Sequence, residues 1–324
     1  MVYGVSGMKK TLFVSFSGGR TLAYMCWWLL DNKADEYDLR FVFANTGLEH
    51  ENTLDFVDRC DREWGLNLTW VEAVTSMEHG VGVTHKVVNY ETAARNGEPF
   101  EQFIRFAGIP NAAYNQCSER LKAMPMEHYR QSQGFTRKHP TAIGIRADEI
   151  DRMSPTAKEN GLVYPLILWT QTTKAEIRHW WAQQPFDLDL PEHLGNCVTC
   201  WKKSDRKLLT IAKHEPERFA FMDRMEREHS HLKAEVTCPK CSGTGLRLVG
   251  YGAGSESAKC LMCKGRGTVT QPRVFFRRHR TAREVLAEAQ KPFKEFVDHM
   301  PELQMGMFDP IDLEDDCGSG CEIQ

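Results

Sequence analysis

TLFVSFSGGRTLAYM, residues 11–25, joins an apolar run to a helix-like run through two adjacent glycines. The apolar residues of Thr11–Ser15 predict a short buried strand, and Thr21–Asp31 predicts a helix that is apolar on nearly all sides. Backbone N–H groups at such a turn, with a helix N-terminus behind them, form a positive concavity that suits phosphate. A plain strand-to-helix turn would show the same pattern, so this stretch alone leaves both interpretations open.

The elements that follow repeat this alternation. Asp38–Asn45 and Leu68–Val74 predict further buried strands, with a helix over Leu54–Trp64 between them. This order indicates an α/β fold with a Rossmann-like parallel sheet and helices on both faces. Residues 76–115, which contain several glycines, predict loops and short helices. The later elements expected are a helix over Cys117–Gln131, a strand over Thr141–Ile145, a helix over Lys174–Gln183 and helical structure over Thr281–Asp298.

The composition is that of an ordinary globular protein. The chain has 324 residues, 41% of them hydrophobic, and a formal net charge of −3, so no overall basic surface points to nucleic acid. No apolar run approaches the ~18 residues of a membrane span, and the first ten residues lack a signal-peptide pattern. These features predict a cytoplasmic protein with no membrane partner. In that reducing compartment, metal ligation explains closely spaced cysteines better than disulfides.

One short pattern, C-x-x-C-x-G-x-G, occurs twice, in Cys238–Gly245 and in Cys260–Gly267. The spacing matches zinc ribbons, in which two cysteine pairs hold one ion tetrahedrally. The alternative is a module without metal. The region is similar to half of the DnaJ-type zinc module, and it could grip RNA, DNA or protein or be purely structural. We predict an inserted knuckle at 237–271 whose structural zinc is bound by Cys238, Cys241, Cys260 and Cys263.

Four other motifs occur in order along the chain before residue 155. They are SFSGGRT at 15–21, FANTGLE at 43–49, QCSERLK at 116–122, and GIRADE at 144–149 followed by Arg152. Together they resemble the phosphoadenylylsulfate (PAPS) reductase-like branch of the PP-loop ATP pyrophosphatase superfamily, which includes many phage proteins. Thr21 and Leu22 stand where ATP-using members usually carry Asp-Ser, and Leu22 offers no hydroxyl. If the chain is phage-encoded, the expected location is the host cytoplasm.

The resemblance implies an adenine nucleotide, either ATP or PAPS, bound over the glycine loop. Glu49 would hold a ribose hydroxyl or a Mg²⁺ ion, or else it is a solvated loop carboxylate. Arg146 and Arg152 would clamp phosphate or sulfate, or else they form surface ion pairs. The predicted nucleotide-binding residues are Ser15, Ser17, Gly18, Gly19, Arg20, Thr21, Asn45, Glu49, Arg146, Asp148 and Arg152.

Cysteines outside the zinc pattern suggest a second metal centre. Cys117 is either a small buried hydrophobe or a thiolate favoured by neighbouring basic residues. The resemblance implies a [4Fe–4S] cluster on Cys117, Cys197 and Cys200, whereas a zinc pair or a redox dithiol are the alternatives for the latter two. Cys317 lies in an acidic tail and only weakly resembles the catalytic cysteine of PAPS reductases. A redox-active tail, a fourth cluster ligand from Cys317 or Cys321, and a plain flexible end are the alternatives for this segment. The predicted catalytic residues are Cys117, Arg146 and Cys317.

Three functions fit these motifs. The first is reduction of a sulfonucleotide, the second is ATP-dependent sulfur transfer to an acceptor such as RNA or DNA, and the third is nucleotide or nucleic-acid binding by an inactive metalloprotein. The expected domains are a nucleotide-binding domain at 8–190, a helical cysteine region at 191–236 and 272–324, and the knuckle at 237–271. A homodimer is a further hypothesis.

Overall fold

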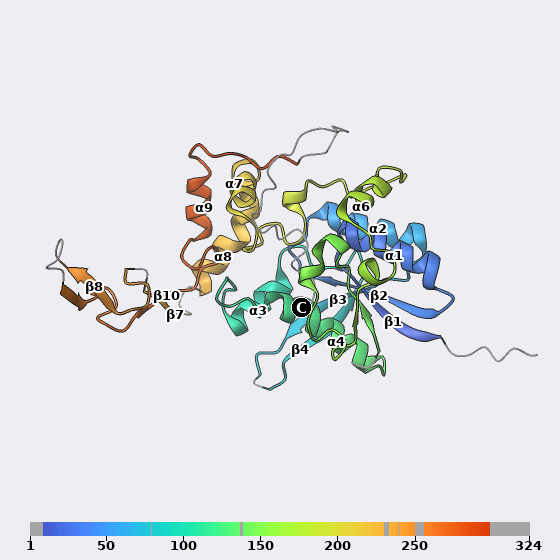
Figure 1. Ribbon diagram of the computed structural model, residues 1–324, viewed down its shortest axis with the longest axis horizontal. Helices are drawn as coiled ribbons and strands as arrows, with labels where there is room; N and C mark the ends of the chain where they lie inside the picture. Colours follow the sequence, from blue (N-terminus) through green and yellow to red (C-terminus); the bar gives the residue numbers. More distant parts are fainter. Residues whose placement is uncertain are drawn as a thin grey trace, which may run out of the picture.

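A six-stranded sheet forms the centre of the molecule (Figure 1). The computed structural model describes residues 9–78, 80–136, 139–229, 233–238, 240–249 and 256–298. The strand order is β4-β3-β2-β1-β5-β6, and all neighbours are parallel except β3 and β4. The predicted α/β class with a Rossmann-like sheet is confirmed. The strands are β1 (Lys10–Phe16), β2 (Tyr37–Asn45), β3 (Thr69–Thr75), β4 (Val83–Val88), β5 (Thr141–Ala142) and β6 (Leu162–Val163).

Two sequence-based expectations about the sheet are wrong. The region 76–115 contains the antiparallel strand β4, and the expected strand over Thr141–Ile145 is reduced to the two residues of β5. Strand β4 is short and has an exposed middle, which hides it in the sequence, and it forms only through its pairing with β3. Strands β1, β2 and β3 begin and end within one residue of the predicted bounds, whereas β6 was not predicted.

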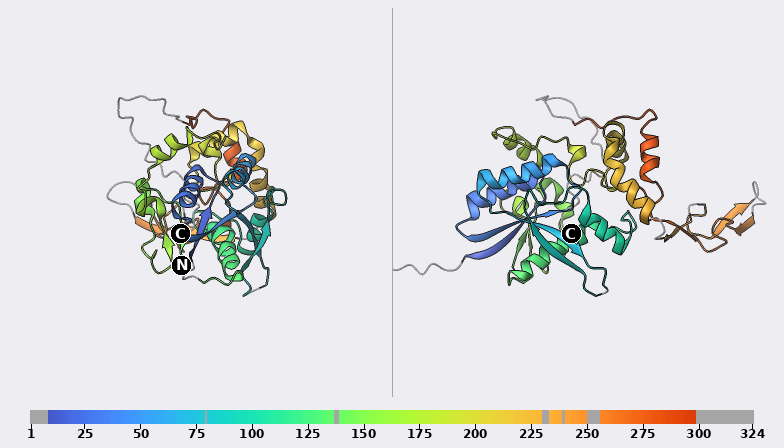
Figure 2. Two further views of the ribbon diagram at one scale, coloured as in Figure 1. Left: turned by 90° about the vertical axis from the view of Figure 1, so that its right-hand side faces the viewer. Right: turned by 180° about the vertical axis from the view of Figure 1, so that it is seen from behind.

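Helices cover both faces of the sheet (Figures 1 and 2). On one face lie α1 (Arg20–Lys33), α2 (Glu51–Trp64) and α6 (Lys174–Trp181), and on the other lies α4 (Met124–Ser132). The surroundings of β1 explain why its sequence is continuously apolar. Leu12 belongs to the large core cluster, whereas Phe13 packs in a separate cluster with Met126 of α4. Both faces of β1 are therefore buried, as is typical of parallel strands.

The helix expected over Cys117–Gln131 is divided into two parts. A π-helix, η1 (Glu119–Ala123), precedes α4, and the Met124 N–H donates to the Glu119 carbonyl. Pro125 has no N–H to donate to the Leu121 carbonyl, so a regular α-helical bond is impossible at this point. Single π-turns inside helices are frequent at functional sites. Here the wide turn places Leu121 and Lys122 beside the cysteine cavity described below.

The second half of the chain adds a helical region to the same core. Helices α7 (Asp205–His214), α8 (Ala220–His229) and α9 (Ala282–Glu288) lie close together, and their apolar residues belong to the cluster that also fills the sheet. The expected helix over Thr281–Asp298 is too long, because α9 ends at Glu288 and Pro292 follows. The remaining helices are α3 (Glu98–Ala107), η2 (Ala147–Arg152), α5 (Pro165–Leu168), η3 (Glu192–Leu194) and η4 (Pro216–Phe219).

An arm of four short strands projects from this helical region (Figure 1). In it β7 (Lys233–Thr237) pairs with β10 (Thr268–Pro272), and β8 (Leu246–Val249) pairs with β9 (Glu256–Lys259), both antiparallel. The root of the arm is held against the main body. Arg273 donates to the Ala107 carbonyl at 2.6 Å and stacks on the Tyr114 ring, and Asn111 donates to the Val274 carbonyl at 2.9 Å.

Glu226 of α8 lies buried at the root of the arm and is expected to make stability depend on pH. It accepts from the N–H groups of Phe275 at 3.0 Å and Ala282 at 2.8 Å, yet burial raises its pKa to about 7. The folded state therefore holds a proton that the unfolded state releases near pH 4.5. Stability should fall as the pH rises from about 4.5 to about 7, by at most about 3 kcal/mol.

Glu226→Gln should flatten this pH dependence, because glutamine does not titrate. Urea unfolding at several pH values between 4.5 and 8 measures the slope. Glu217→Gln removes an exposed carboxylate nearby and serves as the control, whose slope should match that of the unmodified protein. Equal slopes for both variants would show that Glu226 does not titrate with folding.

Among the residues that the structure describes, no helix combines the length and apolar character needed to cross a membrane.

Candidate nucleotide and cysteine site

The glycine loop lies where β1 ends and α1 begins, at the carboxyl edge of the parallel strands. Gly18 has a φ of +81°, and a Cβ there would stand 2.6 Å from Thr53 of α2. Gly19 caps α1 in extended conformation, with no side-chain hydrogen bond at this cap and no acidic residue in the first turn. The first N–H groups of a helix have no partner within it. This end of α1 therefore presents backbone donors of the kind that suit an anion.

Arg146 brings a positive charge to this loop from the other side of β1. Its guanidinium is 3.3 Å from the Thr21 hydroxyl and also contacts Asp148 at 3.0 Å and Glu149 at 3.1 Å. Arg152 pairs in turn with Glu149 at 2.6 Å. Arg146 is buried whereas Asp148 is partly exposed, so an incoming anion can compete with the carboxylates for the buried guanidinium.

Arg20 and Leu22, at the start of α1, make contacts within the protein itself, and the predicted nucleotide contact of Arg20 stays a prediction. Arg20 forms an ion pair with Asp187 at 2.6 Å and also donates to the Leu188 carbonyl. Leu22 is buried, and a Cβ on Gly144 would lie 2.7 Å from its side chain. A glycine at 144 is thus needed to admit Leu22. Ser15 is buried in β1, and Ser17 follows that strand at the loop.

The segment after β2 is organised by its own side chains. Asn45 is fully buried and donates to Glu72 at 2.7 Å and to the Ala94 carbonyl at 2.9 Å. Glu49 accepts from the Thr46 N–H at 3.0 Å and from the Thr46 hydroxyl at 2.8 Å. Both residues therefore hold the loop in place, and their predicted contacts with ribose or Mg²⁺ stay predictions.

Glu49 also joins this loop to the cysteine pair from the second half of the chain. It forms an isolated β-bridge with Cys197, and the Val198 N–H donates to the Leu48 carbonyl at 3.0 Å. The Thr46 hydroxyl lies 3.3 Å from the Cys197 sulfur. The sheet edge that carries the glycine loop is therefore continuous with the cysteine site.

One small buried cavity is lined by all three cysteines predicted to act together, Cys117, Cys197 and Cys200. Lys122 from η1 and Trp201 complete its charged and aromatic walls. The donors suit an iron–sulfur cluster in kind, but a [4Fe–4S] cluster usually takes four thiolates and this cavity offers three. The cavity measures only about 20 Å³, so cluster loading would require side chains to turn outward. Cys317, the remaining predicted catalytic residue, lies outside the described residues.

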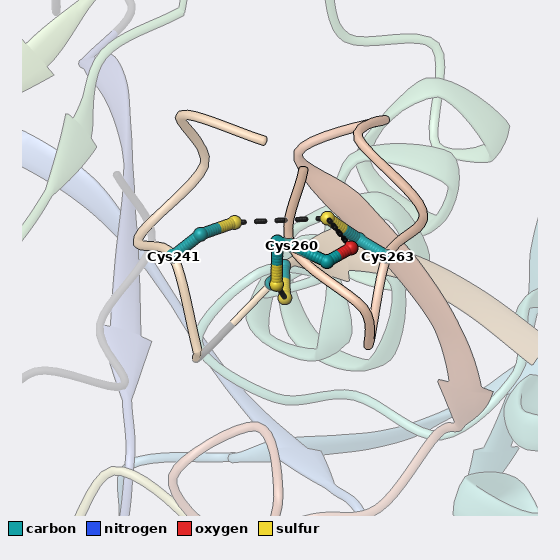
Figure 3. Close-up of side chains that lie close together, drawn as sticks. Cys241, Cys260 and Cys263 are labelled. Atoms are coloured by element: carbon teal, nitrogen blue, oxygen red, sulfur yellow. Dashed lines mark hydrogen bonds between the residues drawn. The ribbon is translucent and has the colours of Figure 1, made fainter. Parts of the chain in front are cut away.

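The four cysteines of the arm form a separate candidate metal site, and Figure 3 labels three of them, Cys241, Cys260 and Cys263. Their sulfurs all lie within 4.8 Å of one another, with Cys238 3.8 Å from Cys260 and Cys241 3.7 Å from Cys263. A tetrahedral ion with bonds of about 2.3 Å to sulfur requires sulfurs about 3.8 Å apart. The geometry therefore fits zinc, and within the described part of the chain no other group of cysteine, histidine or carboxylate ligands is so arranged.

The repeated glycines bring the two halves of this site together. A Cβ on Gly245 would be 2.4 Å from the Gly265 carbonyl oxygen, and one on Gly267 would be 2.3 Å from that of Gly243. The second glycine of each repeat thus allows one backbone to contact the other. Each also accepts from the first cysteine of the opposite repeat, at 2.8 Å. This pairing gives the duplicated pattern a physical reason.

The α/β fold and the glycine loop are typical of nucleotide-binding proteins, and similarity to a known domain family identifies the family. The model of the phosphoadenosine phosphosulfate reductase domain matches residues 11–177, about half of the chain, so the chain belongs to this PP-loop family. The match contains the glycine loop, Cys117 and Arg146, and it ends before Cys197 and the arm.

Three relatives with similar sequences do not indicate which reaction the family member catalyses. A nin region protein of Escherichia phage lambda is 37% identical over 205 residues, which are 62% of this chain and 69% of its own length. Two proteins of Methanocaldococcus jannaschii are 25% and 30% identical over 171 and 122 residues, and this chain spans 33% and 20% of their lengths. All three are named as uncharacterized proteins, so their names say nothing about the reaction.

Several residues of this site escaped the sequence analysis. Thr46, Trp201 and Gly144 acquire their roles only through neighbours far along the chain. Lys122 was noted only as a charge beside Cys117, but the structure buries it 4.0 Å from Glu49. Thr46 and Lys122 lie in the NTG and CSERLK motifs, which are the only features of the sequence that point to them. The motifs do not tell whether these side chains contact a ligand or hold their own loop in place.

Proposed function

We propose that this chain is an enzyme that binds an adenine nucleotide over the N-terminus of α1 and performs sulfur chemistry beside the bound nucleotide. The main support is the joint placement of the open α1 N-terminus and the buried Arg146 guanidinium, which lies 3.3 Å from Thr21. The nucleotide phosphate or sulfate would receive backbone N–H groups and this guanidinium. The bridge between Glu49 and Cys197 supports a reacting end at the cysteine cavity.

In this proposal each of several residues has a distinct role. Gly18 permits the close approach of phosphate, Arg146 balances its charge, and the Glu49 loop fixes Cys197 relative to the nucleotide edge. A cluster bound by Cys117, Cys197 and Cys200 would supply electron transfer or a site for sulfide. Buried Lys122 would offset the negative charge of the thiolates. The zinc of the arm would be structural, and the three proposed domains follow the sequence boundaries given above.

Offering ATP and PAPS separately tests the reaction. Release of sulfite from PAPS in the presence of a dithiol reductant would identify sulfonucleotide reduction. Release of pyrophosphate from ATP would identify ATP-dependent sulfur transfer. The buried Leu22, which replaces a loop hydroxyl, favours the first outcome. Nucleotide binding with neither product would contradict the enzyme and leave an inactive binding protein.

Removing a cysteine from the cavity should abolish the cluster. Protein purified without oxygen should be brown and contain iron and sulfide, whereas Cys117→Ala should lose colour and iron because one of three thiolate ligands is gone. Cys60→Ala is the matched control, since Cys60 is equally buried but lies in α2, outside the cavity. Colourless wild-type protein that holds only zinc would contradict the cluster.

A further inference from the structure

The arm is the basic part of an acidic chain. Residues 233–272 contain six lysines and arginines but only two acidic residues, which leaves 35 basic and 42 acidic residues in the rest of the chain. A net charge of this sign on one projecting module suggests a partner of opposite charge. The family match ends long before this module, so the basic arm is a feature of this chain beyond the shared domain.

Four basic side chains of the arm are exposed. Lys240 lies on the first cysteine turn, Arg247 on β8, Lys259 on β9 and Lys264 just after the second cysteine turn. No ion pair joins any of the four to an acidic side chain within the described residues. Arg247 is opposite Ala258 and Lys259 is opposite Leu246 in adjacent positions of the hairpin, so their side chains leave opposite faces. The positive charge therefore surrounds the arm.

This distribution fits a polyanion better than a protein surface. Lysine is depleted in the cores of protein interfaces, whereas lysine and arginine contacts to phosphate supply most non-specific nucleic-acid affinity. Among the arm residues whose side chains the structure describes, the exposed large apolar residues are Leu246, Leu261 and Met262. Three such side chains are too few to form the apolar centre of a stable protein interface.

The root of the arm connects it to the cysteine cavity. Arg273 and Asn111 fix the arm to the loop that follows α3, and that loop leads directly to Cys117. Phe100 of α3 lines the cavity itself. A partner molecule bound along the arm would thus be held close to the cysteine cavity, because the root of the arm is fixed beside it.

We propose that the arm binds the phosphate backbone of a single-stranded nucleic acid, without sequence preference, through Lys240, Arg247, Lys259 and Lys264. Electrostatic contacts of this kind depend steeply on salt. The proposal does not depend on the reaction, because the arm would bind nucleic acid whether the chain reduces a sulfonucleotide, transfers sulfur or has no activity.

Fluorescence anisotropy with the full zinc-loaded chain tests the proposal. A labelled 20-nucleotide single strand of DNA or RNA is titrated at salt concentrations from 50 to 200 mM. The variant with all four residues replaced by glutamine should bind at least about tenfold more weakly at 100 mM salt. The slope of log K against log salt should also fall by about 3, since each phosphate contact on a single strand contributes about 0.7.

A matched variant replaces four exposed lysines on the main body by glutamine: Lys10, Lys158, Lys291 and Lys294. It carries the same change in net charge and should keep wild-type affinity and slope. Zinc content is measured in every sample, so that loss of the arm's fold is not mistaken for loss of contacts. Equal weakening in both variants, no binding by the wild type, or stronger binding to polyglutamate than to nucleic acid would overturn the proposal.

Discussion

Removing the metal from the arm is expected to unfold residues 233–272 while the sheet and its helices stay folded. Among the arm residues that the structure describes, the apolar cluster consists of the four cysteines and the partly buried Val269. Without an ion, this cluster is far too small to offset the entropy of ordering the chain. Structural zinc in small peptides contributes about 10–16 kcal/mol at neutral pH, which makes folding and metal binding one process.

Hydrogen exchange with and without a chelator measures this effect. Amides of the arm should lose protection by about hundredfold or more, whereas those of β1 and β2 should change little. Cys260→Ser should reproduce the effect of the chelator and lower the zinc content. Equal protection of the arm with and without zinc would contradict the metal's structural role.

Cys26→Ser provides the reciprocal control. Cys26 is fully buried in α1, where burial strongly raises the pKa of its thiol, so it acts as a small apolar side chain. A serine hydroxyl buried there without a partner should destabilise the main body by about 1–3 kcal/mol. The zinc content should stay unchanged. The two variants would then separate the stability of the body from that of the arm.

The elements predicted correctly are those whose signal is local. The β1–loop–α1 unit combines a buried apolar strand, two glycines and an apolar helix, and each of these features is contained within 15 residues. The grouping of the four arm cysteines could also be predicted from their spacing, because thiols three residues apart can face one ion wherever the module lies.

The elements missed depend on contacts between distant parts of the chain. Strand β4 forms through pairs such as Val71 with Val87, and its exposed middle residues carry no strand signal. The contacts of Glu49 show the same dependence. Its carboxylate accepts hydrogen bonds within its own loop, and its backbone pairs with Cys197, which lies almost 150 residues further on. Its predicted contact with ribose or Mg²⁺ stays a prediction.

Gly18→Ala is expected to abolish nucleotide binding and to destabilise the fold. A φ of +81° costs a residue with a Cβ about 1–2 kcal/mol, and the added atom would meet Thr53 at 2.6 Å and Val57 at 3.0 Å. These contacts tie the loop to α2, so relief of the clash moves the loop away from its anion-binding form. We expect a loss of about 2–5 kcal/mol in the free energy of unfolding.

Two other glycines separate the causes of this effect. Gly19→Ala should change stability by less than about 0.5 kcal/mol, because its φ is negative and the only atom near the new Cβ, the Ser17 hydroxyl oxygen, is 4.0 Å away. Gly65→Ala places a Cβ in open space at a φ of +63° and should show the backbone cost alone, about 1 kcal/mol. Urea unfolding and calorimetric nucleotide titration of the three variants give both quantities. If Gly18→Ala lost no more stability than Gly65→Ala and still bound nucleotide, the loop would not need its close contact with α2, and phosphate binding over α1 would lose its structural basis.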